Sequence, residues 1–272
     1  MKIAKHLLVF VIIAFFFSGC LDVQTTVNVN KDGSGTINEK VLFSKDMVAL
    51  ISGFNKPDSA DSSGNSKFSL MNVEELKSHA PEMGEGVKFV SSKEIEEDGK
   101  EGYTAVYSFT DLSKLKISEN PDNKMGMSGN DKGKKEKKDY MTFKFNPGSP
   151  AEILINMSKK DLKKKSQPKN SSKDTSSANN AFAKQFLSMM KDFRIAVKLH
   201  VNGKIENTNA TYVNGSDVTL FDISFNELFK DKDKLDKFSK MEGEDVSEIK
   251  KFLKGIPGIK VEFNNPVSIK FE

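Results

Sequence analysis

The chain has 272 residues, enough for one large or two small domains, and 42 basic against 38 acidic side chains give it a formal charge of +4. Such a balanced charge is not the signature of a nucleic-acid-binding protein, so no nucleic-acid partner is expected. With one cysteine, Cys20, the chain cannot form an internal disulfide, and a domain of this size can instead rest on its hydrophobic core.

Residues 1–19 have the order of a secretory signal peptide. Lys2 and Lys5 precede an apolar run over residues 7–17 that is too short to cross a membrane comfortably, and small residues follow it. The tetrapeptide Phe17-Ser18-Gly19-Cys20 resembles the lipobox of bacterial lipoproteins. In that family the cysteine is acylated, as with palmitate, and becomes the first residue of the mature protein.

The resemblance implies an exported protein that is held to a membrane by a covalent lipid at Cys20. Two or more acyl chains hold a protein stably, because each buried methylene contributes about 0.8 kcal/mol. Leu21, and not Asp, follows the cysteine, which is similar to the pattern of outer-membrane lipoproteins in enterobacteria. The outer membrane is therefore expected if the source has two membranes.

The first elements after Cys20 are predicted to be a hairpin and a helix. Apolar and polar side chains alternate over residues 22–30, the period of a half-buried strand, and a second strand is predicted at 36–43. The glycine-containing segment 31–35 between them is typical of a hairpin turn. Ser44 can cap a helix whose apolar side chains recur at helical spacing.

The middle of the chain alternates predicted strands with polar segments. A loop is predicted at 55–66, and Asn72 with Glu75 resembles a capping box that opens a short helix. Strands are predicted at 87–96 and 103–109, joined as a hairpin through Asp98-Gly99, and at 140–145 and 153–157. Two insertions, 120–139 and 159–179, are polar and lysine-rich and cannot bury enough apolar surface to order themselves, so both are predicted to be disordered.

The last third predicts a helix, strands and two further helical segments. An amphipathic helix over 182–193 leads into a strand at 195–201, and Asn214-Gly215 closes a hairpin onto a strand at 218–225. Helical spacing returns around Leu228 to Phe238 and again at 246–253, and short strands follow at 259–263 and 267–271. Hairpins interspersed with single helices indicate an α+β fold around an antiparallel sheet, with residues 20–272 forming a single lipid-anchored domain.

Several of these segments together resemble a known family. They are the hairpin with Asp32-Gly33-Ser34-Gly35, the helix after it, the aromatic strand 103–109 with Asp111, and segments 202–210 and 217–219. In this arrangement the chain is similar to the LppM-type domain of bacterial envelope lipoproteins over residues 20–225. The resemblance implies an envelope-facing α+β module and no catalytic residues.

Candidate sites for a metal or for catalysis are few. Residues 30–37 match much of a calcium-binding EF-hand loop, but Val41 stands where a bidentate Glu should close the shell, and the flanks have strand period. A hairpin turn is the favoured interpretation. His79 and His200 are isolated, and His200 lies with Ala196 and Lys198 on the polar side of its strand, so no metal site is expected.

The leading hypothesis from the sequence is a non-catalytic lipoprotein that binds another envelope component, either a protein or a lipid. No catalytic residue and no cofactor are expected, and Cys20 is the site residue, as the point of lipid attachment. Two alternatives stay open. An envelope hydrolase would need two acidic side chains that converge in a cleft, and an apolar-ligand carrier would need an open hydrophobic cavity between sheet and helices.

Overall fold

The computed structural model describes residues 21–54, 70–118, 140–157, 193–239 and 246–272. The predicted signal peptide 1–19, Cys20, the polar loop 55–66 and the insertions 120–139 and 159–179 lie outside these residues. The described part consists of two mostly antiparallel sheets with short helices, which confirms the predicted α+β class.

The larger sheet has eight strands, in the order β10-β11-β8-β1-β2-β4-β3 with β12 paired to β11. Its strands are β1 (Leu21–Val29), β2 (Gly35–Ser44), β3 (Lys88–Glu97), β4 (Lys100–Phe109), β8 (Phe193–Val201), β10 (Val213–Asn214), β11 (Asp217–Ser224) and β12 (Ile259–Val261). The predicted hairpins are confirmed at β1–β2, β3–β4 and β10–β11.

One pairing in this sheet was not predicted. Strands β1 and β8 run parallel, with Leu21 opposite Phe193 and Val29 opposite Val201, whereas the other strand pairs within the described residues are antiparallel. Parallel neighbours need a long crossover connection, and here the chain between β1 and β8 supplies it. The first strand after Cys20 therefore lies in the middle of the larger sheet.

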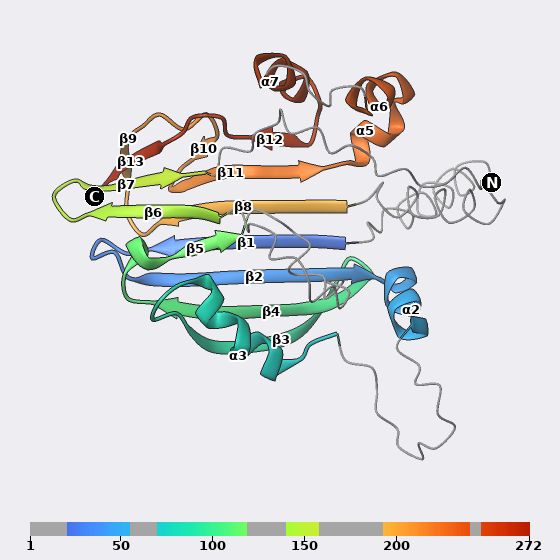
Figure 1. The fold of residues 1–272 in the computed structure, drawn as a ribbon, viewed down its shortest axis with the longest axis horizontal. Coiled ribbons are helices and arrows are strands. Elements are labelled where there is room, and N and C mark those ends of the chain that lie inside the picture. Colours follow the sequence, from blue (N-terminus) through green and yellow to red (C-terminus); the bar gives the residue numbers. More distant parts are fainter. Residues whose placement is uncertain (1–20, 55–69, 119–139, 158–192, 240–245) are drawn as a thin grey trace, which may run out of the picture.

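The second sheet has five strands, in the order β5-β6-β7-β13-β9, and lies over one face of the larger sheet (Figure 1). Its strands are β5 (Lys116–Ser118), β6 (Tyr140–Asn146), β7 (Ala151–Asn156), β9 (Ile205–Thr208) and β13 (Val267–Phe271). The two C-terminal strands were predicted next to each other in sequence and are present. They join different sheets, however, since β12 pairs with β11 and β13 pairs with β7 and β9.

The main hydrophobic core lies between the two sheets. Alternate residues of β1 and β2, among them Val27, Val29 and Ile37, pack against Ile153 and Ile269 of the second sheet, and all are almost completely buried. Burying a side chain of this size contributes about 1.5–3 kcal/mol. The alternation read from the sequence of β1 thus separates a core face from a polar face.

The helices are short and lie at the margins of the sheets. They are α2 (Lys45–Phe54), α3 (Val73–His79), α5 (Asn226–Lys230), α6 (Lys232–Ser239) and α7 (Val246–Lys254), with 3-10 turns η1 (Ala80–Met83) and η2 (Leu112–Lys114). Both predicted caps form: Ser44 Oγ accepts from Met47 N at 3.2 Å, and Asn72 Oδ1 accepts from Glu74 N and Glu75 N at 3.1 and 3.3 Å. No helix within the described ranges is long and apolar enough to cross a bilayer.

The helix predicted over 182–193 lies outside the described residues, except for its last residue, Phe193. Phe193 was placed on the apolar face of that helix, and this assignment is wrong, because Phe193 is the first residue of β8. The reason is its pairing with Leu21: the parallel register of β1 and β8 starts at this pair, which buries both side chains.

A second apolar cluster lies where β1 and β8 begin. We call this side of the larger sheet, formed by the ends of its strands, the β1-start end. Leu21, Val23, Val41, Phe43 and Phe193 form the cluster, and Met47 and Val48 of α2 pack against it. Figure 1 shows α2, α5 and α6 at this end. A third cluster joins α5 to α7 and β12 through Leu228, Ile256 and Ile259, with Leu235 and Phe252 packed against it.

A small polar group lies on the core face of the larger sheet. Glu39, 7% exposed, faces the same side as Tyr103 and Tyr107, and the hydroxyl of Tyr107 has no hydrogen-bond partner among the described residues. Burial in the first place, and the negative charge of Glu39 in the second, raise the pKa of both tyrosines above its usual value near 10.

Because the pKa values of these two tyrosines are raised, we expect the folded protein to become less stable at alkaline pH. Above pH 10 they ionise in the unfolded chain while the folded chain keeps them neutral, so stability that is fully present below pH 10 is lost as the pH rises. We expect the free energy of unfolding to fall by up to about 1.4 kcal/mol per pH unit for each tyrosine. Urea titrations at pH 8 and pH 11 measure it. The double variant Tyr103→Phe/Tyr107→Phe should lose this slope, and an unchanged slope would contradict the assignment.

Candidate functional site

The face of the larger sheet that points away from the second sheet, here called the polar face, carries hydroxyl, amide and charged groups. Successive side chains of a strand point to opposite faces, so the residues between the core positions of β1, β2 and β4 gather here. They surround a depression of about 200 Å³, lined by Gln24, Thr26, Asn38, Lys40, Thr104 and Val106 of this face together with Glu39 and Ala105, whose side chains belong to the core face.

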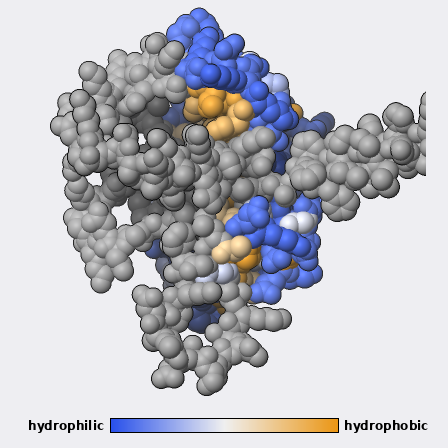
Figure 2. Space-filling model, turned by 90° about the vertical axis from the view of Figure 1, so that its right-hand side faces the viewer, coloured by the Kyte–Doolittle hydropathy of each residue, from blue (hydrophilic) through white to orange (hydrophobic). Residues whose placement is uncertain are grey.

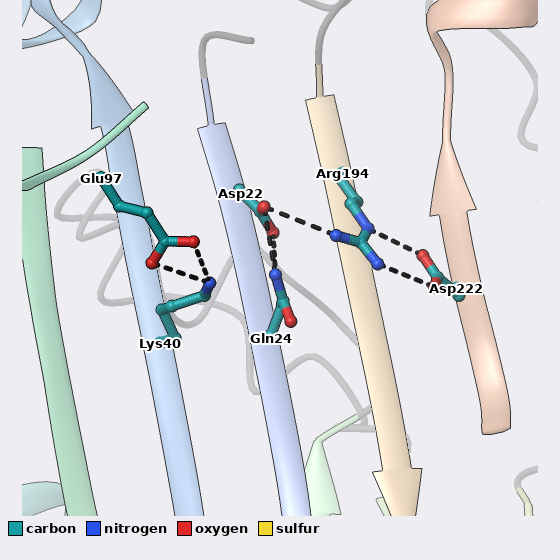
Figure 3. Close-up of polar contacts among 6 residues, drawn as sticks. All are labelled: Asp22, Gln24, Lys40, Glu97, Arg194 and Asp222. Atoms are coloured by element: carbon teal, nitrogen blue, oxygen red, sulfur yellow. Dashed lines mark hydrogen bonds and ion pairs between the residues drawn. The ribbon is translucent and has the colours of Figure 1, made fainter. Parts of the chain in front are cut away.

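An ion-pair network lies beside the depression, toward the β1-start end (Figure 3). Arg194 on β8 donates from Nε and Nη2 to the two carboxylate oxygens of Asp222 on β11, both at 2.9 Å. Its Nη1 lies 3.7 Å from Oδ2 of Asp22 on β1. One guanidinium therefore ties together three neighbouring strands, in the bidentate geometry that lysine cannot provide.

Two further polar contacts lie on the same face. Gln24 donates from Nε2 to both carboxylate oxygens of Asp22 at 3.1 Å, so Asp22, a residue that is only 8% exposed, has an amide partner as well as Arg194. Farther across the sheet, a separate ion pair joins Lys40 on β2 to Glu97 on β3 at 3.1 Å. Figure 3 shows the six side chains in one row across the strands.

The electrostatics favour a permanently charged Arg194. Its hydrogen bonds to Asp222 are the largest cause that raises its pKa further above the usual value, and the negative charges of Asp222 and Asp22 act in the same direction against desolvation. The guanidinium is thus committed to its two carboxylates.

The residues that sequence analysis discussed as candidates lie elsewhere on the fold. His200 is half-buried on the polar face, as its strand position predicted, and its Nδ1 lies 2.7 Å from Asp217 Oδ1 on β11. The segment 30–35 is a hairpin turn: Asp32 accepts from the backbone N and the hydroxyl of Ser34 at 3.0 and 2.7 Å. The favoured interpretation of the EF-hand-like segment is therefore confirmed.

Sequence analysis missed the Arg194 network. A signal was present, because Arg194 is the one arginine among 42 basic residues. A chain that uses lysine everywhere else and arginine once indicates a position where a planar, bidentate donor is needed. Its partners, Asp22 and Asp222, could not have been named without the strand order.

The polar face is suited to hydrogen bonding with a polar partner. The depression offers the amides of Gln24 and Asn38, the hydroxyls of Thr26 and Thr104, and the ammonium of Lys40. The amides and hydroxyls can both donate and accept hydrogen bonds, and the ammonium can donate them. Asp22 and Asp222 are the acidic side chains that converge beside it, and both converge on Arg194.

No protein-family model matches the chain, and no curated protein matches it either. Among solved structures, the chain is similar to the folded domain of LppM from Mycobacterium tuberculosis, determined by NMR, with a TM-score of 0.30 and 11% sequence identity. The match covers 78% of this chain and 86% of that chain. No residue role is carried over from this similarity.

Proposed function

We propose that the protein is a non-catalytic lipoprotein of the bacterial cell envelope, exported and anchored by a lipid at Cys20, that binds another envelope component through its polar face. In a source with two membranes we place it in the outer membrane. The component is a protein or a lipid whose exposed groups are polar, since amide, hydroxyl and ammonium groups line the depression.

The observation that carries the proposal is the position of Cys20 relative to the fold. The lipobox-like segment 17–20 ends one residue before β1, and β1 is a central strand paired on both sides. A cut before Cys20 would leave every strand of the described residues intact, and this supports the proposal.

The anchor predicts complete loss of lipid from a Cys20→Ala variant. Cells grown with labelled palmitate should incorporate label into the wild-type protein and none into the variant, because the acyl chains are bound through the sulfur. The variant should also leave the membrane fraction. Ser18→Ala, which keeps a small residue before the cysteine, is the matched control and should retain both label and membrane association. Equal label in the wild type and Cys20→Ala would end the proposal.

The binding part is tested in the same cells by photo-crosslinking. A photoreactive side chain in place of Asn38, an exposed residue that lines the depression, should yield a crosslinked partner. The same group in place of Asn214, equally exposed on β10 and away from the depression, is the control. Identical crosslinks from both positions would contradict binding by the polar face.

The two alternatives stay predictions. For the hydrolase, Asp22 and Asp222 are the acidic pair to test, although Arg194 holds both. For the apolar-ligand carrier, the space between the sheets is occupied by the side chains of the main core. The acidic pair does not favour the hydrolase over binding by the polar face, and the filled core does not favour the apolar-ligand carrier over it.

A further inference from the structure

The β1-start end combines the origin of the predicted lipid anchor with exposed aromatic and basic side chains. Leu21 is the first residue of β1 and is almost fully buried, so the chain enters the fold here without a spacer. Consecutive Cα atoms are 3.8 Å apart, which places the β1-start end within one residue of the acylated cysteine. Any lipid on Cys20 must therefore leave the protein at this end.

A series of aromatic contacts leads from this point to α6. Phe193, opposite Leu21 in the sheet, contacts Phe225 with ring centroids 6.0 Å apart, and Phe225 contacts Phe238 of α6 at 6.3 Å. Phe238 in turn stacks on Phe252 of α7 at 6.3 Å. The helices α6 and α7 are thus packed beside the start of β1 and β8.

Phe238 is unusual in its exposure. It is 38% exposed, and within the described residues the other large hydrophobic side chains exposed to this degree are Val90 on β3 and Val213 on β10. Val213 lies close to the opposite end, where β11 begins and β8 ends. Figure 2 looks onto the β1-start end and shows apolar surface next to hydrophilic residues in its upper part, where Figure 1 places α5 to α7.

The two helices that carry this apolar surface have more lysines than carboxylates. They contain Lys232, Lys234 and Lys237 on α6 and Lys250, Lys251 and Lys254 on α7, against Asp233, Asp236 and Glu248. Lys237 lies over the ring of Phe252 and Lys250 over the ring of Phe263, each 5.4 Å from the ring centroid. Aromatic and aliphatic side chains beside lysines are the composition with which helices lie in the head-group layer of anionic membranes.

We propose that the β1-start end, with α6 and α7, is a membrane-contact surface that lies on the bilayer holding the lipid of Cys20. Phe238 enters the head-group layer, and the lysines of α6 and α7 face lipid phosphates. Strands β1 and β8 then run away from the membrane. The polar face is therefore roughly perpendicular to the bilayer, and its depression opens parallel to the membrane surface, toward a partner. This inference rests on the proposed lipid anchor and adds a fixed orientation to it.

Tryptophan fluorescence can test the orientation directly, because the chain contains no tryptophan. Phe238→Trp introduces one probe at the proposed contact, and Val213→Trp introduces one at a position of similar exposure, 42%, away from it. Both full-length lipidated proteins are reconstituted into vesicles of phosphatidylethanolamine and phosphatidylglycerol that contain phospholipid brominated near the head group. Far-UV circular dichroism verifies that both variants fold.

We expect at least twofold quenching in Phe238→Trp and almost none in Val213→Trp. Equal quenching of the two variants, or none in either, on protein that floats with the vesicles would overturn the orientation and leave the anchor standing. Protein that does not float with the vesicles would overturn the anchor, and the orientation with it. As a second variant, a 15-residue Gly-Ser insertion between Cys20 and Leu21, with a reach of about 20 Å, should reduce the quenching in Phe238→Trp. Undiminished quenching would overturn the claim that the direct connection sets the orientation.

Discussion

Phe271→Ala is expected to reduce the free energy of unfolding by about 3–5 kcal/mol. Phe271 is completely buried in the main core on β13, an inner strand of the second sheet that lies between β7 and β9. Truncation removes most of its ring from close packing and leaves a cavity that the two sheets cannot close without moving apart. Typical domains are stable by only 5–15 kcal/mol in total, so the change should be plain in a urea titration followed by circular dichroism.

The same substitution at Phe238 is the matched control for Phe271→Ala. Phe238 is 38% exposed and contacts two other rings, so Phe238→Ala should cost about 1–2 kcal/mol, less than half the loss at Phe271. Comparable losses at both positions would show that burial between the sheets does not decide the stability. The packing of the second sheet on the first would then need another explanation.

Arg194→Met is expected to lower the free energy of unfolding by about 2–3 kcal/mol at neutral pH. The variant leaves the carboxylates of Asp22 and Asp222, 12% and 16% exposed, next to each other without their shared cation. Removing one partner of a fully buried pair costs more than this, but Arg194 itself is 34% exposed and water screens part of the charge. Thermal and urea unfolding measure the loss.

Two further variants isolate the contribution of the guanidinium. Lys40→Met makes the same kind of change on the same face, but its partner Glu97 is 51% exposed, so a loss below about 1 kcal/mol is expected. Arg194→Met combined with Asp222→Asn should recover part of the stability, because the second change removes one uncompensated charge. If the double variant is less stable than Arg194→Met, the network is not held by charge pairing.

The local elements of this fold could be predicted because their signals are local. The alternation in residues 22–30 separates the core face from the polar face of β1, and Asp98-Gly99 and Asn214-Gly215 close their hairpins. The caps at Ser44 and Asn72 follow from side chains within three residues of the helix start. In each case the decisive contact joins residues that are close in sequence.

The remaining features depend on pairings between distant segments. Nothing in β1 specifies that β8 is its parallel neighbour. Any strand with the same alternation of apolar residues could pair with β1 and continue the apolar face that carries Val23 and Val27. The division of the strands into two sheets is equally hidden. For the same reason Arg194 could be noticed in the sequence, but the carboxylates that it binds belong to strands placed beside it only by the fold.

The place of β13 in the second sheet has a consequence during protein synthesis. This strand is the last of the described strands and lies between β7 and β9 in its sheet, and its register pairs Phe271 with Ala151, 120 positions earlier. Until the ribosome has released it, β7 and β9 each lack a neighbour and present open backbone donors and acceptors. A polypeptide that ends before Val267 would therefore expose the unpaired edges of β7 and β9, and we expect such fragments to aggregate.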